Sequence, residues 1–320
     1  MRALFIDDGL RLTDIPAPSP SAGEALVRVT LAGICGTDLE LGRGYMGFRG
    51  VPGHEFVGVV EDASAPEDQR RLWLGRRVTG EINIACGRCA SCARGLGRHC
   101  PTRTVLGILG RDGAHAERLT LALRNLHVIP DSVADLDAVF AEPLAAACEI
   151  LEQVRVQGST RVVVVGDGRL GQLVARVLRT VTRSVTVLGR HPSKLALLAP
   201  LDVRIALSAE EAGADFDLAV EATGSPGGLD AALGFLRPRG TLVLKSTYQG
   251  GRPVPVFRIV VDEITLVGSR CGRIEAALPL LASGEIKVRD LVTDVFPLDE
   301  AVRAYERAAD GEALKVLLEP

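Results

Sequence analysis

The sequence has 320 residues, 47% hydrophobic and 24% charged, as in globular proteins long enough for two domains. Its net charge of −3 excludes the basic field that holds nucleic acids or anionic membranes. No uninterrupted apolar run approaches the roughly 18 residues of a membrane helix, and the first residues show no secretory pattern. We therefore expect a cytoplasmic protein that binds neither nucleic acid nor membrane.

The first part of the chain is predicted to form a small β domain. Short apolar segments separated by Gly, Pro and Asp are found at residues 2–7, 10–15, 25–31, 56–60, 76–79, 115–121 and 125–129. Many short strands with turn residues between them favour a barrel-like arrangement. The polar segment 64–71 is expected to be a surface loop, and a helical, Ala-rich pattern follows at 135–154.

Four of the seven cysteines lie close together, with the spacing C-x2-C-x2-C-x7-C: Cys86, Cys89, Cys92 and Cys100. Such short intervals let one loop surround a single tetrahedral zinc with four thiolates, which leaves no position for a substrate. Disulfides and unrelated thiols are the alternatives, but clustering and an odd count in a chain without an export pattern favour a metal. A zinc lobe that only mediates interactions is a further alternative, which the balanced charge disfavours.

From residue 161 onwards the pattern changes to buried strands that alternate with helices. The short apolar runs are 161–165, 184–188, 216–220, 241–245 and 264–267. The segments between them, at 170–180, 192–199 and 227–235, are long enough for helices. Alternation of this kind predicts a doubly wound parallel sheet.

A glycine-rich fingerprint, Gly-Asp-Gly-Arg-Leu-Gly, follows the first of these strands and leads into a helix. In this context the glycines allow a tight turn, close approach of a pyrophosphate and close helix–strand packing, while the helix N-terminus faces the phosphates. Asp167 is tolerable there only if its charge points away from the phosphates. The residues predicted to bind a dinucleotide here are Gly166, Gly168, Arg169, Leu170 and Gly171.

The end of the second strand indicates which dinucleotide is preferred. A site that prefers NAD places Asp or Glu there to bind the ribose 2′-hydroxyl, whereas this chain has Gly189 and Arg190. No carboxylate repels a 2′-phosphate, and an arginine is able to bind one, so the pattern favours NADP over NAD. The alternative is that Arg190 is an ordinary surface arginine.

One further stretch carries groups that suit a catalytic zinc. Gly-Ile-Cys-Gly-Thr-Asp at 33–38 and Gly-His-Glu at 53–55 offer a thiolate, a hydroxyl, an imidazole and a carboxylate. Cys35 and His54 are nineteen residues apart, so spacing alone does not show that they meet. Taken alone, the stretch is better explained by an inert buried cysteine and a hydrogen-bonded loop histidine.

Together these segments resemble the zinc-dependent medium-chain dehydrogenase/reductase family, closest to its threonine and polyol dehydrogenase branch. Segments 33–38 and 53–58, the four-cysteine lobe, Ala-Glu-Pro-Leu-Ala at 141–145 and the glycine fingerprint occur in the family's order. The resemblance implies an α/β protein with a GroES-like β-barrel domain at 1–140, which includes the zinc lobe at 86–100 and is completed by 272–320. A Rossmann domain that binds NAD(P) is expected at 141–271.

The resemblance also implies roles for particular residues. Two zinc ions per chain are expected, one structural in the lobe and one catalytic, the latter held by Cys35, His54 and one or both of Glu55 and Glu142. Thr37 matches the hydroxyl that takes the proton of the bound alcohol, and the outer relay falls to Glu40 or to water. Thr223 and Gly224 fall where the family lines the nicotinamide ribose site.

The activity implied is hydride transfer between a secondary alcohol, such as a polyol or amino alcohol, and NAD(P), with zinc activating the hydroxyl or ketone. An NADPH-dependent ketone reductase and a non-catalytic dinucleotide-binding scaffold are the alternatives. The substrate pocket is expected to involve residues 45–49, Tyr248 and 270–273. The edge strand at 264–267 is expected to pair with a second copy, giving a homodimer or homotetramer.

Overall fold

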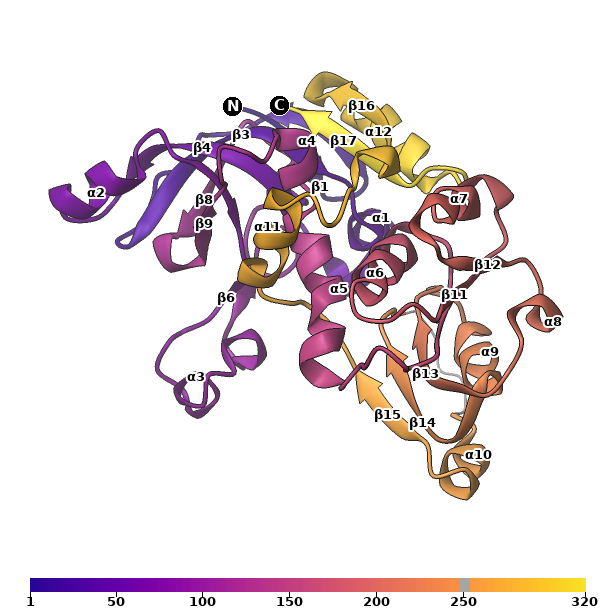
Figure 1. Cartoon of the computed structure of the whole chain (residues 1–320). Helices are drawn as coiled ribbons and strands as arrows, with labels where there is room; N and C mark the ends of the chain where they lie inside the picture. The colour runs from indigo at the N-terminus through magenta and orange to yellow at the C-terminus, as the bar shows by residue number, and fades with distance from the viewer. Residues whose placement is uncertain (248–253) are drawn as a thin grey trace. The chain divides into compact units, whose positions relative to one another are not determined.

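The computed structural model describes residues 1–247 and 254–320, so Tyr248, expected near the substrate, lies outside the described residues. The chain divides into two compact units (Figure 1). Unit 1 comprises 1–142 and 274–320, and unit 2 comprises 143–273. The sequence placed these boundaries at 140/141 and 271/272.

Unit 1 is built on a mainly antiparallel β framework, in which only β16 and β17 pair in parallel among the described strands. Its main sheet has the strand order β16-β17-β3-β4-β5-β9, with β8 also paired to β3. The strands of unit 1 are β1 (Arg2–Ile6), β2 (Leu10–Asp14), β3 (Glu24–Gly33), β4 (Glu55–Ala63), β5 (Arg77–Gly80), β6 (Asn83–Ile84), β7 (Thr104–Val105), β8 (Arg118–Ala122), β9 (Leu126–Val128), β16 (Val292–Pro297) and β17 (Lys315–Glu319). The long strand β3 alternates buried and more exposed residues over much of its length, the pattern of a sheet packed on one face.

The helices of unit 1 are short and connect or cover these strands. They are α1 (Gly36–Gly42), α2 (Glu67–Trp73), α3 (Ala90–Ala93), α4 (Asp135–Ala138), α11 (Ile274–Ala282) and α12 (Ala301–Ala309). Helix α12 buries Ala301, Ala304 and Tyr305 in a core cluster with Leu4 and Ile34. The last segment of the chain therefore completes the core beside the start of α1.

The segment 64–71, expected to be a surface loop, instead contains most of helix α2. Pro66 precedes the helix, Glu67 and Asp68 lie in its first turn and two arginines lie in its last turn, which matches the helix dipole at both ends. The Arg71 guanidinium also pairs with Glu67 one turn away, at 2.8 Å. Sequence pattern missed this helix because it has no apolar stripe and no buried residue.

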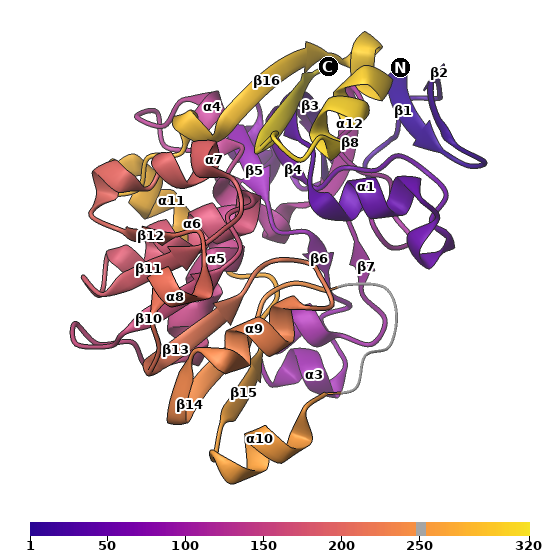
Figure 2. The ribbon, with the colours of Figure 1, turned by 90° about the vertical axis from the view of Figure 1, so that its right-hand side faces the viewer.

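Unit 2 is a parallel sheet with the strand order β12-β11-β10-β13-β14-β15, in which every described pairing is parallel. Its strands are β10 (Val162–Val165), β11 (Val185–Leu188), β12 (Arg204–Ala206), β13 (Phe216–Glu221), β14 (Leu236–Leu244) and β15 (Thr265–Gly268). Numbered along the chain, this order is 3-2-1-4-5-6, the Rossmann arrangement. Helix α9 packs on β13 and β14 (Figure 2).

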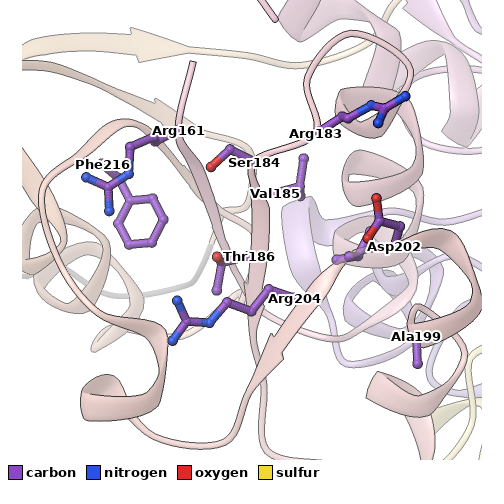
Figure 3. A pocket seen from close by; sticks show the side chains of 10 residues that line it. Arg161, Arg183, Ser184, Val185, Thr186, Ala199, Asp202, Arg204 and Phe216 are labelled. Carbon is purple, nitrogen blue, oxygen red and sulfur yellow. The ribbon is translucent and has the colours of Figure 1, made fainter. Parts of the chain in front are cut away.

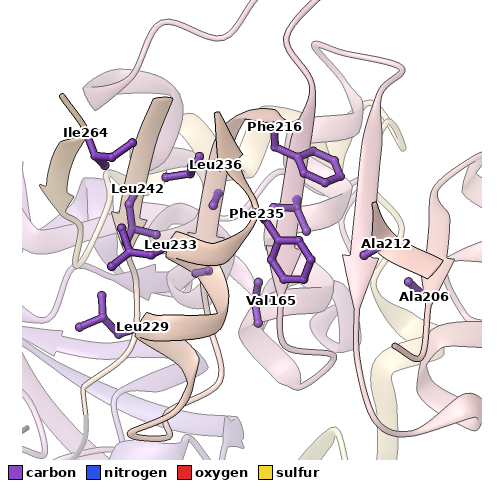
Figure 4. Close-up of a cluster of buried hydrophobic side chains, with 13 residues drawn as sticks. Val165, Ala206, Ala212, Phe216, Leu229, Leu233, Phe235, Leu236, Leu242 and Ile264 are labelled. Atoms are coloured by element: carbon purple, nitrogen blue, oxygen red, sulfur yellow. The ribbon is translucent and has the colours of Figure 1, made fainter. Parts of the chain in front are cut away.

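The helices of unit 2 are α5 (Ala141–Gln153), whose first two residues belong to unit 1, α6 (Arg169–Arg179), α7 (Pro192–Ala196), α8 (Ala209–Ala212), α9 (Gly228–Gly234) and α10 (Val256–Val261). Figure 4 shows the core between the sheet and α9, where Leu229 and Leu233 lie near Leu242. Phe216 and Phe235 meet edge to face in the same cluster, with ring centroids 6.2 Å apart. The expected α/β fold class is thus confirmed.

Candidate active site

The four cysteines of the lobe converge. The Sγ atoms are 3.5 Å apart for Cys89 and Cys92, 3.9 Å for Cys86 and Cys92, and 3.8 Å for Cys89 and Cys100. A tetrahedral zinc with bonds of about 2.3 Å requires sulfur atoms about 3.8 Å apart. None of the seven cysteines is in a disulfide, and the lobe therefore fits one zinc.

The pKa values of these thiols also favour a bound cation. The backbone N–H of Arg88 and the Thr102 hydroxyl lower the pKa of Cys86 to about 6, which favours a thiolate. Burial and the hydrogen bond with the Cys89 thiol raise the pKa of Cys92 to about 11. Thiols this close cannot all ionise unless a cation lies between them.

A second cluster forms where strand β3 ends and strand β4 begins. The antiparallel ladder pairs Gly33 with Glu55, the last residue of β3 with the first of β4. Cys35 follows β3 by two residues and His54 directly precedes β4, so the register brings them together across the nineteen-residue gap. Ligand atoms of Cys35, His54 and Glu55 all lie within 4.8 Å of one another. A metal centre suits such a group.

A buried carboxylate, Asp38, fixes this cluster. Its Oδ2 accepts the backbone N–H of Cys35 at 2.8 Å, and its Oδ1 accepts that of Gly53 at 3.2 Å. The same Oδ1 lies 3.2 Å from Nδ1 of His54, although the angle falls short of a hydrogen bond. With Nδ1 turned to a carboxylate, Nε2 is the nitrogen left for a metal.

The charges of this group are strongly coupled to one another. Burial by itself raises the pKa of Asp38, but the neighbouring His54 lowers it to about 2. Burial by itself lowers the pKa of His54, yet the charges of Asp38 and Cys35 hold it well above its ordinary value of 6.5. Without a metal, the imidazole therefore keeps a proton in the position that a cation would take.

Glu55 has a partner of its own. Its carboxylate is hydrogen-bonded to Nζ of Lys315 on strand β17, and both side chains are almost fully buried, at 1% and 3% exposure. Nζ also lies 5.6 Å from the ring centroid of Phe140. A side chain at Gly33 would collide with the Glu55 carboxylate, so the glycine is required for this close packing.

Of the other residues expected at the catalytic zinc, Thr37 lies close to the Cys35 thiol, whereas Glu40 and Glu142 are not part of the cluster. Thr37 is in the first turn of α1, with its Oγ1 3.9 Å from the Cys35 Sγ. Glu40, one turn further along the same helix, pairs with Arg43 at 2.7 Å near the surface. Glu142 is half-buried in the first turn of α5 and is not part of the three-residue group.

The fingerprint glycines of unit 2 have the geometry that a dinucleotide site needs. Gly166 has φ 123°, and a Cβ there would lie 2.6 Å from the carbonyl oxygen of Ala222. A Cβ at Gly171 would collide with the Gly166 carbonyl. Gly168, at the N-cap of α6, faces open space and leaves the first N–H groups of that helix without a side-chain cap. A helix N-terminus with this approach suits a pyrophosphate.

Asp167 folds back onto the end of strand β11. Its Oδ2 accepts the backbone N–H groups of Arg190 and His191, each at 2.7 Å, and its Oδ1 lies 3.0 Å from the His191 ring nitrogen Nδ1. Burial raises the pKa of Asp167, but these contacts outweigh it and lower the pKa. The carboxylate is therefore ionised and held against the loop that contains Gly189 and Arg190. The Arg190 side chain is exposed.

The loop after strand β13 is also fixed by a buried carboxylate. Glu221 accepts the backbone N–H of Thr223 at 2.7 Å and the Thr223 hydroxyl at 2.6 Å, and it is hydrogen-bonded to the Ser246 hydroxyl. The Gly224 N–H donates to the same Ser246 oxygen at 2.9 Å. The network sets the backbone of 223–224 at the carboxyl end of the sheet, where doubly wound folds bind their ligands.

Sequence reasoning missed three of these positioning residues: Asp38, Lys315 and Ser246. Lys315 is the one that left a signal, since it is one of only four lysines and stands at the start of an apolar strand, Lys-Val-Leu-Leu-Glu. A lysine in such a position needs a buried acidic partner. Asp38 lies in the motif at 33–38, in which only the cysteine and the threonine were given roles. Ser246 is not part of any pattern in the sequence.

Comparison with known proteins identifies the class. Residues 21–131 match the alcohol dehydrogenase GroES-like domain, and residues 170–283 match the zinc-binding dehydrogenase domain. The chain is 30% identical to an L-threonine 3-dehydrogenase of Chelativorans sp. (strain BNC1) over 98% of this chain and 96% of that one. The fold and site thus define a zinc-binding dehydrogenase with a Rossmann-type domain.

Solved structures agree. A zinc-binding dehydrogenase of Sinorhizobium meliloti 1021 bound to NADP is 27% identical with a TM-score of 0.91, and the alignment covers 100% and 99% of the two chains. An alcohol dehydrogenase (rspB) of Escherichia coli CFT073 complexed with NADH is 28% identical, with the same TM-score and coverage. The chain belongs to the zinc-dependent alcohol dehydrogenase family of medium-chain dehydrogenases/reductases. It is an NAD(P)-dependent oxidoreductase that acts on an alcohol. Among the described residues, no helix is long and apolar enough to cross a membrane.

The raised pKa of His54 predicts pH-dependent zinc affinity. Below pH 6.5 zinc must displace a proton from His54, so the affinity rises about tenfold per pH unit from this proton alone. In the metal-free chain the same shift stabilises the fold below about pH 6.5, and that stability is lost as the pH rises through the folded-state pKa. Asp38→Asn removes the charge that holds the proton, so the dependence on pH becomes shallower.

The measurement is competition with a chromophoric chelator between pH 5 and 6.5. A Cys35→Ser, His54→Gln variant, which keeps only the lobe, supplies the background to subtract. An equally steep dependence in Asp38→Asn and the unchanged chain would contradict the assignment.

The Lys315–Glu55 pair predicts a large effect on stability. Lys315→Met leaves a buried carboxylate without a partner and is expected to lower the free energy of unfolding by about 3–5 kcal/mol. Adding Glu55→Gln removes the unpaired buried charge and is expected to recover most of the lost free energy of unfolding. Denaturant unfolding followed by circular dichroism measures both, and Lys287→Met, at an exposed lysine, is the control and changes stability by at most about 0.5 kcal/mol. A double variant no more stable than Lys315→Met would refute this account.

Proposed function

We propose that the protein reversibly oxidises a secondary alcohol that bears a neighbouring hydroxyl or amino group, using two zinc ions per chain and preferring NADP. The observation that carries the proposal is the convergence of Cys35, His54 and Glu55 beside the Thr37 hydroxyl. The threonine dehydrogenase relative supports the substrate class, because its named substrate has an amino group beside a secondary hydroxyl.

The proposed roles follow from the positions of the side chains. Bound zinc would supply Lewis acidity that lowers the pKa of a substrate hydroxyl, and a bound nicotinamide would supply the hydride acceptor or donor. Thr37 Oγ1 would accept the hydroxyl proton of the substrate during oxidation while it releases its own hydroxyl proton, and both transfers would reverse during ketone reduction. Glu40, one helical turn away and fixed near the surface by Arg43, or water would take up the released proton. Asp38 keeps the His54 ring oriented throughout.

Two carboxylates compete for the remaining place in the proposed metal shell. Glu55 is near enough to bind, but Lys315 already compensates its charge. Glu142, half-buried in the first turn of α5, or water would take this place if Glu55 stays paired with Lys315. Cys86, Cys89, Cys92 and Cys100 hold the second, structural zinc.

Thr37→Val tests the proton step because it removes the hydroxyl and keeps the shape. The turnover number is expected to fall about 10²- to 10⁴-fold, the range for loss of a general acid–base group. Zinc content by atomic emission is expected to remain two per chain, and the dissociation constant for NADPH is expected to be unchanged. Thr37→Ser, which restores a hydroxyl, recovers much of the rate. Full activity in Thr37→Val, or a single zinc in the unchanged chain, would remove this mechanism.

The preference for NADP rests on Arg190. The Asp167 carboxylate already accepts the backbone N–H groups at the end of β11, so these donors are not available to a 2′-phosphate. The exposed Arg190 guanidinium would then supply the positive charge that binds it. Arg190→Ala is expected to weaken NADPH binding about 10- to 100-fold and to leave NADH binding unchanged. Fluorescence titrations of both cofactors measure the effect, and tighter binding of NADH by the unchanged chain would overturn the preference.

An apolar surface on unit 2 supports a homo-oligomer. Strand β15 ends the described sheet, and the adjoining helix α10 exposes Phe257 at 81% and Val260 at 67%. A second copy that pairs along β15 would cover these side chains. Phe257→Asp is expected to shift the mass measured by sedimentation towards that of one chain, and a monomeric unchanged chain would contradict the proposal.

A further inference from the structure

Unit 2 has a cavity at the end of its sheet away from the dinucleotide fingerprint. The cavity has a volume of about 500 Å³ and is lined where strands β10 to β13 begin (Figure 3). The fingerprint follows the carboxyl end of β10, whereas Arg161 directly precedes that strand. Because all these strands are parallel, the cavity lies at their amino ends, whereas the dinucleotide fingerprint lies at their carboxyl ends. It is therefore a separate site.

Two arginines flank the cavity without a carboxylate partner among the described residues. The Arg161 guanidinium donates to the carbonyl oxygens of Ala214 and Asp215, each at 3.0 Å, and stands 5.3 Å from the ring centroid of Phe216. The Arg204 guanidinium donates to the carbonyl of Glu211. Carbonyls anchor a guanidinium without cancelling its charge, and each guanidinium has five N–H donors. Both arginines therefore retain charge and free donors.

Two hydroxyls of strand β11 lie between these arginines. Ser184 and Thr186 are two residues apart, so they share one side of the strand, and Figure 3 shows them pointing into the space between Arg161 and Arg204. Thr186 is only 5% exposed. Among the described residues its hydroxyl has no hydrogen-bond partner, and its oxygen keeps some exposure, so it is open to the cavity. The cavity thus contains a hydroxyl that is free to bind a ligand.

Two aspartates near the cavity, of which Asp202 is part of its lining, have arginine partners. Asp202 pairs with Arg179 at 2.7 Å, and Figure 3 shows it across β11 from the two hydroxyls. Asp217 pairs with Arg237 at 2.6 Å and accepts the backbone N–H of Arg161. The charge that remains around the hydroxyls is positive.

We propose that this cavity binds the phosphate group of a small phosphorylated metabolite, such as a sugar phosphate. Guanidinium groups and hydroxyls together are the donors that bind phosphate oxygens. The volume exceeds that of a phosphate ion and falls within the range of small-molecule sites, about 300–1,000 Å³. Arg161 and Arg204 bind the phosphate from its two sides, and Thr186 donates to it from the sheet.

The test is isothermal titration calorimetry of ribose 5-phosphate into the zinc-loaded enzyme saturated with NADPH, so that the dinucleotide phosphate sites are filled. Unmodified ribose is the neutral control ligand, and inorganic phosphate tests the anion alone. Thr186→Val removes the hydroxyl and keeps the shape, while Arg204→Gln removes the charge. Arg303→Ala, at an exposed arginine of unit 1, is the matched control for loss of charge.

Ribose 5-phosphate is expected to bind, and ribose is not. Each cavity variant is expected to weaken binding about tenfold, whereas Arg303→Ala leaves it unchanged. Unchanged thermal melting and an unchanged dissociation constant for NADPH show that the variants are folded. Absence of binding, or equal binding by the unchanged chain and both cavity variants, overturns the proposal. Binding of inorganic phosphate that the same variants weaken supports recognition of the phosphate group itself.

Discussion

The buried carboxylate of Asp38 is the interaction on which the proposed catalytic centre depends. It joins the N-terminus of α1 to the turn before β4 by accepting the N–H groups of Cys35 and Gly53, and it lies against the His54 ring. Two segments nineteen residues apart thereby share one ionised group. In an interior of low polarity such a group stabilises the structure only while its partners remain in place. Asp38 thereby contributes to the positions of both the thiol and the imidazole.

A second buried charge, Lys315, ties the end of the chain to this centre. Strand β17 pairs with β3 and brings the lysine to Glu55 across 260 residues of sequence. The pair places a positive charge against a residue that directly follows a proposed zinc ligand. In the proposed function, the lysine and a metal ion would compete for this one carboxylate.

In unit 2 the proposed dinucleotide site depends more on the shape of the backbone than on pairs of charged side chains. Gly166 and Gly171 make the turn between β10 and α6 so tight that added Cβ atoms would meet carbonyl oxygens. Asp167 then accepts the backbone N–H groups that follow β11 and holds that loop in place. At the amino ends of the same strands lie the arginines and hydroxyls of the proposed phosphate site. One sheet therefore has a dinucleotide fingerprint at one end and a cavity with positive charge at the other.

The sequence by itself determined the class of fold, the two-part organisation and the residue types at both proposed zinc sites. These features are local: thiols at short spacing, glycines between a strand and a helix, and apolar periodicity. Helix α2 and strand β12 were missed because a fully polar helix and a three-residue edge strand have no such pattern. Only the tertiary structure decided that Asp38, Lys315 and Thr186 matter. Their significance comes from burial beside partners, or from the lack of one, and burial is a property of packing that sequence spacing does not contain.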